Sequence, residues 1–156
     1  LLYGESLEVG AAASVYTACR EAEIIRTPED IANVSTVTSD DVFRFYSKIV
    51  REFDLEIKPP TPTDYLPHLC SELSIPASIQ HDALAIGELA EKRTLHVGRN
   101  PQVLAGAIIE LTLKHNSGSE DVTQQEIADA CNCSTAGLRS SRDMLADSQE
   151  VKFDSL

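Results

Sequence analysis

The sequence predicts an all-α fold made of two related helical units. Aromatic residues make up only 5% of the chain and Trp is absent, so Leu, Ile, Val and Ala must fill the core; the alanine-rich runs favour closely packed helices. Ser, Thr and Pro recur at positions typical of helix starts. One pattern also occurs twice: residues 4–13 align with residues 98–107, and residues 27–32 align with residues 123–128 after a shift of two residues.

The first copy of the pattern begins with two helices. Residues 6–21 are rich in alanine and predict the first of them. Thr27 suits the N-cap of a short second helix over residues 28–34, because Pro28 is well tolerated at the first helical position.

A third helix follows Thr38 or Ser39, either of which can cap it, and continues to about residue 53. Its apolar residues recur at helical spacing, which predicts a buried stripe. The residues of this stripe are Val42, Phe45, Tyr46, Ile49, Val50 and Phe53.

The second copy reads as five helices. A stiff proline-rich linker, residues 55–63, separates residues 64–146 from the first unit, residues 1–54. Helices are expected over residues 64–73, 76–93, 100–114, 123–130 and 134–146, with a loop at residues 116–119 and a frayed tail over residues 147–156. If the copies were once equal, the first unit holds only the last three helices of five.

Charge argues against a general nucleic-acid binder. The chain has 25 acidic residues against 13 basic ones and a formal net charge of −12, whereas proteins that bind nucleic acids over a wide surface are basic. A local basic patch remains compatible with DNA binding. An acidic surface also suits very high salt, where repulsion is screened over only about 3 Å at ~1 M, so we expect a haloarchaeal source.

The chain shows no targeting or membrane segment. No apolar run approaches the ~20 residues of a membrane span, and no signal peptide is recognisable. We therefore expect a cytoplasmic protein with no membrane partner. Because the chain starts with Leu1 and the first copy is short, we also expect a truncated N-terminus.

Neither a cofactor site nor an enzyme signature is recognisable. The cysteines Cys131 and Cys133 have no second Cys/His pair nearby, so we expect small buried thiols and no zinc site. The chain has no phosphate-binding glycine loop and no nucleophile elbow, and its histidines are scattered. We expect a protein that is not an enzyme.

A short helix, a tight turn and a longer helix occur together twice, over residues 28–53 and 123–146. In such helix-turn-helix units the second helix can enter the major groove of DNA. The alternative is a pair of packed helices without a DNA role.

Charge placement favours the second copy as the DNA-binding one. Residues 92–109 and 130–142 contain no acidic residue; the first stretch includes Arg99, and the second includes Arg139 and Arg142. A helix N-terminus beside an arginine is a natural phosphate site. In the first copy the last helix begins with acidic residues and Glu5 stands in place of Arg99; the basic residues left to reach phosphates are Arg44, Lys48 and Arg51.

The chain resembles the core domain of archaeal transcription initiation factor B, the counterpart of eukaryotic factor IIB, from about residue 4 to residue 145. The shared words, in order, are Ala11-Ala12-Ala13-x-x-Tyr16-x-Ala18-Cys19-Arg20, Arg26-Thr27, Ile31-Ala32-x-Val34-Ser35, Arg51-Glu52-x-Asp54-Leu55, Pro59-Pro60-x-Pro62-x-Asp64-Tyr65-x-Pro67, Ser71-Glu72-Leu73, Gly98-Arg99 and Thr123-Gln124-x-Glu126-Ile127-Ala128. Their order and spacing together make the resemblance specific.

The resemblance implies two cyclin-like repeats, the first incomplete, each with a helix-turn-helix. It implies a general transcription initiation factor that clamps the TATA-binding protein on promoter DNA, reads the B-recognition element with its second repeat, and stabilises the complex for RNA polymerase. The family's zinc ribbon, which engages the polymerase, does not occur in this chain. No cofactor and a weakened or lost polymerase contact are therefore expected.

The resemblance also implies which residues bind DNA. Arg99 falls at a phosphate-contacting arginine, and Ala136 and Arg139 fall at the base-reading positions. The remaining DNA-binding positions on the last helix are Ser134, Thr135, Ser140 and Arg142. Three departures weaken contact: the small Ala136, Arg142 in place of an aromatic residue, and Glu5 in place of an arginine. The alternative function is a cyclin-like protein-interaction module, or a truncated paralogue that no longer supports initiation.

Overall fold

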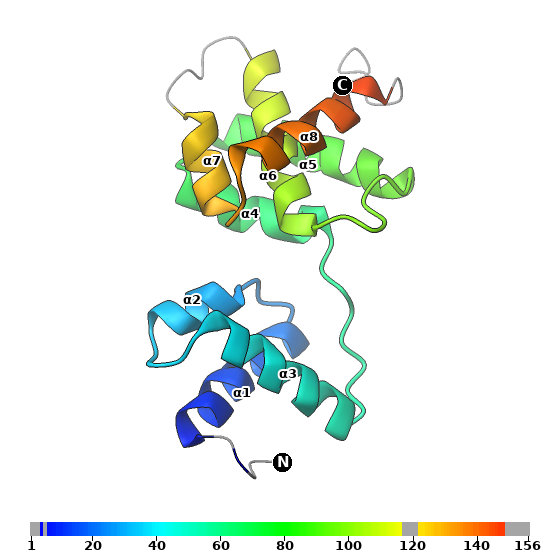
Figure 1. Cartoon of the computed structure of the whole chain (residues 1–156). Helices are drawn as coiled ribbons and strands as arrows, with labels where there is room; N and C mark the ends of the chain where they lie inside the picture. Colours follow the sequence, from blue (N-terminus) through cyan, green and yellow to red (C-terminus); the bar gives the residue numbers. More distant parts are fainter. Residues whose placement is uncertain (1–3, 5, 117–121, 149–156) are drawn as a thin grey trace. The chain divides into compact units, whose positions relative to one another are not determined.

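The computed structural model describes residue 4, residues 6–116 and residues 122–148. This part of the chain forms eight α-helices and no strand, which confirms the all-α prediction (Figure 1). The chain divides into two compact units, Leu1–Pro59 (unit 1) and Pro60–Leu156 (unit 2), and the boundary falls within the proline-rich segment.

Unit 1 consists of α1 (Leu7–Glu21), α2 (Pro28–Asn33) and α3 (Ser39–Glu52). Each helix begins after a hydroxyl side chain that accepts a hydrogen bond from a backbone N–H of the first turn. These caps are Ser6, Thr27 and Thr38, and Thr27 and Asp30 form a reciprocal capping box. The helix starts were therefore readable from the sequence.

The core of unit 1 lies between α1 and α3. Ala13 is fully buried and packs with Phe45 and Ile49, while Tyr16 packs with Val42. The predicted stripe is wrong at its end, because Phe53 is 62% exposed. α3 ends at Glu52, and Phe53 is its C-cap residue, so helical spacing no longer points that side chain inward.

Unit 2 consists of α4 (Pro62–Glu72), α5 (Ala77–Lys92), α6 (Pro101–His115), α7 (Gln124–Ala130) and α8 (Thr135–Asp147). α4 begins two residues earlier than predicted, because Asp64 accepts a hydrogen bond from the backbone N–H of Thr61 at 2.7 Å and Pro62 fits the first helical position.

α6 is the central helix of unit 2, and α4, α5, α7 and α8 all pack against it. Its core side chains Leu104, Ile108 and Ile109 are fully buried. Gly106 permits the close approach of α7 and α8, because a Cβ at this position would clash with Cys131 Sγ and crowd Leu138. Fixing α7 and α8 to one buried helix gives the helix-turn-helix a rigid support.

The two units share a three-helix arrangement, in which α1, α2 and α3 correspond to α6, α7 and α8. In both units the third helix packs against the first and the second. Thr38 and Ser134 cap the third helix in the same way, each accepting a hydrogen bond from the N–H three residues later. With these caps aligned, the positions buried in both units are Val42 and Leu138, and Ile49 and Leu145.

The described residues contain no helix that is both long and apolar enough to cross a membrane. They also contain no group of three His, Cys, Asp or Glu side chains that could hold a metal ion. All four cysteines are free thiols. Burial raises the pKa of Cys70 to about 11, and burial is also the main cause that raises the pKa of Cys131 to about 12.

Candidate DNA-binding site

The α7–α8 pair forms a tight helix-turn-helix. Thr123 and Glu126 form a capping box at the start of α7. Asn132 in the turn has a φ of 49°, a left-handed conformation that asparagine adopts more readily than most residues. Ser134 Oγ then accepts a hydrogen bond from the Gly137 N–H at 3.1 Å and starts α8.

Six of the predicted DNA-binding residues lie at the N-cap of α8 and along its first two turns. Ser134, Ala136, Arg139 and Ser140 are exposed, whereas Thr135 and Arg142 are half-buried. Because Ser134 caps the helix, its hydroxyl already has a structural task. Ala136 and Arg139 lie three residues apart and so share one face of α8.

Arg99, the seventh predicted residue, is exposed and lies two residues before α6. Asn100 caps α6 by accepting hydrogen bonds from the N–H groups of Gln102 and Val103. Gln102 Nε2 donates to the carbonyl of Ala130 at 3.2 Å, so the first turn of α6 contacts the end of α7. The structure thus brings the segment that carries Arg99 beside the helix-turn-helix.

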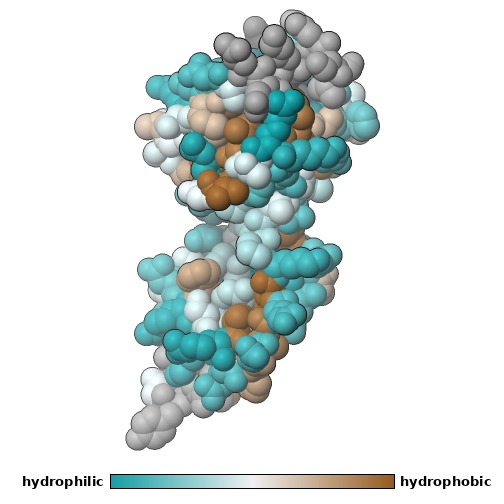
Figure 2. Space-filling model, turned by 90° about the vertical axis from the view of Figure 1, so that its right-hand side faces the viewer, coloured by the Kyte–Doolittle hydropathy of each residue, from teal (hydrophilic) through white to brown (hydrophobic). Residues whose placement is uncertain are grey.

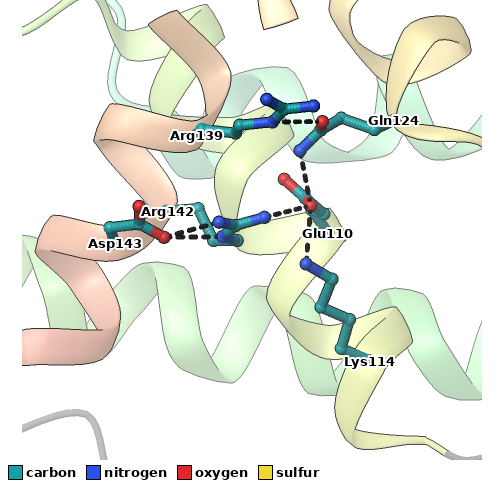
Figure 3. Close-up of polar contacts among 6 residues, drawn as sticks. All are labelled: Glu110, Lys114, Gln124, Arg139, Arg142 and Asp143. Atoms are coloured by element: carbon teal, nitrogen blue, oxygen red, sulfur yellow. Dashed lines mark hydrogen bonds and ion pairs between the residues drawn. The ribbon is translucent and has the colours of Figure 1, made fainter. Parts of the chain in front are cut away.

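A polar network links side chains of α6, α7 and α8 (Figure 3). At its centre is Glu110 on α6, whose side chain is only 6% exposed. Glu110 Oε1 accepts hydrogen bonds from Arg142 Nη1 at 2.7 Å, from Gln124 Nε2 at 2.8 Å and from Lys114 Nζ at 2.9 Å. Gln124 Oε1 in turn accepts a hydrogen bond from Arg139 Nε at 2.7 Å.

The network keeps Glu110 ionised. Burial by itself raises the pKa of the carboxyl, but hydrogen bonds and charges from Lys114 and Arg142 outweigh burial and lower the pKa below its ordinary value. Arg142 also donates from Nε and Nη2 to Asp143 Oδ1, at 2.9 and 2.6 Å. These bonds to Asp143 and Glu110 raise the pKa of Arg142.

The two predicted arginines of α8 therefore stand in different environments. Two carboxylates engage the guanidinium of Arg142, and its side chain is 19% exposed. Arg139 donates only from Nε, and within the described parts of the chain no hydrogen bond or ion pair engages its two terminal amino groups. Arg139 can present these groups to a ligand without breaking a hydrogen bond or ion pair to the described residues.

Unit 1 offers a less suitable surface at the corresponding place. Asp40 and Asp41 lie in the first turn of α3, and Arg44 forms an ion pair with Asp41 at 2.9 Å. Lys48 Nζ lies 5.5 Å from the centre of the Phe45 ring. Glu5, which the sequence places opposite Arg99 in the repeat, lies outside the described residues.

Comparison with known proteins identifies the family. Residues 1–52 and 56–147 match the model of the transcription factor TFIIB repeat. The chain belongs to this family. The resemblance to archaeal factor B is thereby confirmed, and the family is one of transcription factors and not of enzymes.

The curated relatives are archaeal proteins named transcription initiation factor IIB. The chain is 35% identical to those of Methanosphaerula palustris and Archaeoglobus fulgidus over 153 residues, and to that of Methanococcus maripaludis over 139 residues. These alignments cover 98%, 98% and 89% of this chain. They cover 45%, 46% and 40% of the relatives, so the chain spans less than half of their length.

Two residues of the TFIIB repeat in unit 2 were missed by sequence reasoning, Glu110 and Gln124. A signal for Glu110 existed, because a carboxylate between Ile109 and Leu111 in an otherwise apolar helix needs a cationic partner when buried. That partner is Arg142, which stands where the family usually has an aromatic residue. Gln124 was visible only as part of the shared motif Thr123-Gln124-x-Glu126-Ile127-Ala128, and its role could not be read because its partners lie 14 and 15 residues away on the neighbouring helices α6 and α8.

Proposed function

We propose that the chain is the DNA-binding core of a general transcription initiation factor. In this proposal it binds the complex of the TATA-binding protein with promoter DNA, and α8 of unit 2 reads the B-recognition element in the major groove. It thereby stabilises the complex to which RNA polymerase is recruited. The protein acts in the cytoplasm without a cofactor of its own, and the haloarchaeal source stays a prediction.

The observation that supports this proposal best is the state of Arg139. It is exposed on the second turn of α8, and its terminal amino groups have no hydrogen bond or ion pair to the described residues. Two parallel N–H groups match the O6 and N7 acceptors of guanine in the major groove. Arg99, ahead of α6, is placed to contact phosphate, which positions the protein without reading sequence.

Binding of the chain to promoter DNA in the presence of the TATA-binding protein tests the proposal. The affinity for a promoter with its B-recognition element is compared with that for a promoter in which the element is mutated. Arg139→Ala is expected to reduce the ratio of these affinities by about tenfold, within the 1–3 kcal/mol of a bidentate base contact. An unchanged ratio would show that Arg139 does not read bases.

Unit 1 supports a second function, protein interaction. Six of the seven exposed large apolar side chains among the described residues belong to it: Leu7, Val15, Ile24, Val34, Phe43 and Phe53. Brown apolar surface interrupts the hydrophilic surface in the view of Figure 2. A chain that binds the TATA-binding protein equally well with and without promoter DNA, and ignores the element, would favour this reading.

A further inference from the structure

We propose that Gln124 is a positioning residue that holds Arg139 in the orientation needed to read a base, and that Glu110 fixes Gln124 in turn. The inference rests on the proposed function, because it assigns how the reading arginine is aimed. It is carried by three side chains from three helices, linked by hydrogen bonds of 2.8 and 2.7 Å (Figure 3).

The amide of Gln124 has only one favourable orientation. Its Nε2 donates to the Glu110 carboxylate and its Oε1 accepts from the Arg139 guanidinium. Turning the amide over would set an oxygen against a carboxylate and an N–H against a guanidinium N–H. The charges on both sides therefore determine which end of the amide faces the arginine.

Glu110, at the other end of this series of hydrogen bonds, is itself held in place. Glu110 is nearly buried in the central helix of unit 2, and Lys114 and Arg142 donate to the same oxygen that receives Gln124. A carboxylate bound from three directions has little freedom to move. Its position is transmitted through one amide to the exposed surface.

The bond to Gln124 engages the part of Arg139 that base reading does not need. Only Nε donates to Gln124, which leaves both terminal amino groups for a ligand. Arginine loses much side-chain entropy when it is immobilised on binding. An arginine that is already held loses less of this entropy, so its binding to the correct base is more favourable.

Comparison with unit 1 indicates that the hydrogen bonds of Gln124 are not needed to pack α7 against α8. The positions that correspond to Gln124 and Arg139 are Pro28 and Phe43. Neither side chain can form a hydrogen bond, yet α2 and α3 pack together as α7 and α8 do. The bond between Gln124 and Arg139 is therefore better explained by the orientation of the arginine than by helix packing.

The test compares Gln124→Ala with Gln125→Ala in the whole chain. Gln125 is the matched control, because it lies on the same helix, is exposed, and donates to Asp129 at 2.8 Å away from the network. Gln124→Ala is expected to lower about threefold the ratio of affinities for the matched element and for an element whose guanine is replaced, which is part of the roughly tenfold loss expected from Arg139→Ala. The salt dependence of binding should stay unchanged, because no phosphate contact is lost. Gln125→Ala should change neither.

A double-mutant cycle separates positioning from a general structural effect. With Arg139→Ala in place, Gln124→Ala should produce no further loss of discrimination. An equal loss with and without the arginine would overturn the proposal, as would a normal ratio in Gln124→Ala when Arg139→Ala lowers it. If Gln124→Ala unfolds, Gln124→Met keeps the bulk of the side chain and removes only its polar atoms.

A measurement without DNA distinguishes failure of this inference from failure of the proposed function. In the free protein, the Nε–H resonance of Arg139 should exchange slowly with water, and Gln124→Ala but not Gln125→Ala should accelerate that exchange. No acceleration would show that Gln124 does not hold the arginine. Acceleration together with an Arg139→Ala variant that discriminates normally would show instead that the arginine is held but does not read bases, which overturns both proposals.

Discussion

The two units use the same three-helix frame but join its first and third helices by different chemistry. In unit 1, Tyr16 on α1 meets Tyr46 on α3 edge to face, with ring centroids 4.9 Å apart. Glu110 on α6 and Arg142 on α8 occupy the corresponding positions in unit 2 and form an ion pair at 2.7 Å. An aromatic pair and an ion pair therefore serve as alternatives at one place in the repeat.

This difference between the units separates charges that join helices from a charge that is exposed on the surface. In unit 2 the carboxylate of Glu110 binds Arg142 and, through Gln124, orients Arg139. In unit 1 the aromatic pair extends to Phe43, whose ring lies 6.0 Å from that of Tyr46. The unit with the polar join presents a cation on its third helix, and the unit with the aromatic join presents an apolar ring.

The central helices also differ in how well they are covered. Ile108 and Ile109 of α6 are fully buried, and α4 and α5 pack on α6. The corresponding residues of α1 are Ser14 and Val15, which are both exposed. Within the described part of unit 1, the helices that pack against α1 are α2 and α3.

The largest expected effect is a difference in stability between the units of this chain. Fully burying one large aliphatic side chain stabilises by about 1.5–3 kcal/mol, so two such residues favour unit 2 by about 3–6 kcal/mol. Amide hydrogens of α1 and α3 should therefore exchange well before those of α6. Hydrogen exchange followed by mass spectrometry measures both units in one sample, and equal protection would contradict the comparison.

The next test replaces the ion pair of unit 2 with the aromatic pair of unit 1. Arg142→Tyr removes the closest cation from a nearly buried carboxylate and should destabilise unit 2 by about 2–3 kcal/mol, with Lys114 limiting the loss. The double variant Glu110→Tyr with Arg142→Tyr reproduces the pair of unit 1 and should recover most of that stability, because replacing both members of an ion pair is often nearly neutral. Urea unfolding gives both values. A double variant that is less stable than either single variant would show that the ion pair and the aromatic pair are not interchangeable.

The same pair predicts a dependence of stability on pH. The pKa of Glu110 is lowered from 4.5 in the folded protein, so its contribution is fully present above the ordinary value and is lost as the pH falls through the lowered one. The Tyr–Tyr double variant should lose less stability over that acidic range than the unmodified chain does. Parallel unfolding curves on both sides of the ordinary pKa provide the measurement.

Helix positions followed from the sequence because caps are local. Thr27 with Asp30, and Thr123 with Glu126, are three residues apart and determine where α2 and α7 begin. The end of α3 was less readable, and the periodic pattern was extended one residue too far, to the exposed Phe53. The site was predictable only in part, because Arg139 has a signal in charge and position whereas its support comes from residues on two other helices.

Arg142 shows the limit most clearly. Its charge and its place on α8 suggested DNA, but two carboxylates hold it in the folded unit. Whether an arginine of α8 is held by a carboxylate of another helix depends on contacts such as that between Arg142 and Glu110, 32 positions apart. Spacing along one helix does not contain that information.

Substitution of the two exposed arginines, Arg99 and Arg139, is expected to have moderate and different effects on DNA binding. Arg99→Ala should weaken binding to matched and mutated elements about equally and lower the salt slope by roughly one, as for a phosphate contact. Arg139→Ala should instead change the ratio of the two affinities. Titrations at several salt concentrations separate these behaviours, and an Arg99→Ala variant that alters the ratio would contradict the assignment to phosphate.

The smallest effect is expected from exchanging residues at the start of the third helix. Asp40 and Ala136 correspond in the repeat, and both are exposed. Asp40→Ala removes one negative charge from unit 1 and should tighten promoter binding about twofold at low salt, an effect that screening abolishes when salt is raised. Ala136→Asp introduces the same charge beside Arg139 and should weaken binding more strongly, because repulsion then acts at the reading helix itself. Losing an acidic residue from the first turn also destabilises α3 by about 0.3–1 kcal/mol, so the unfolding free energy of Asp40→Ala is measured alongside. If the two substitutions change affinity by the same factor, units 1 and 2 lie equally close to DNA, and the assignment of base reading to unit 2 alone is wrong.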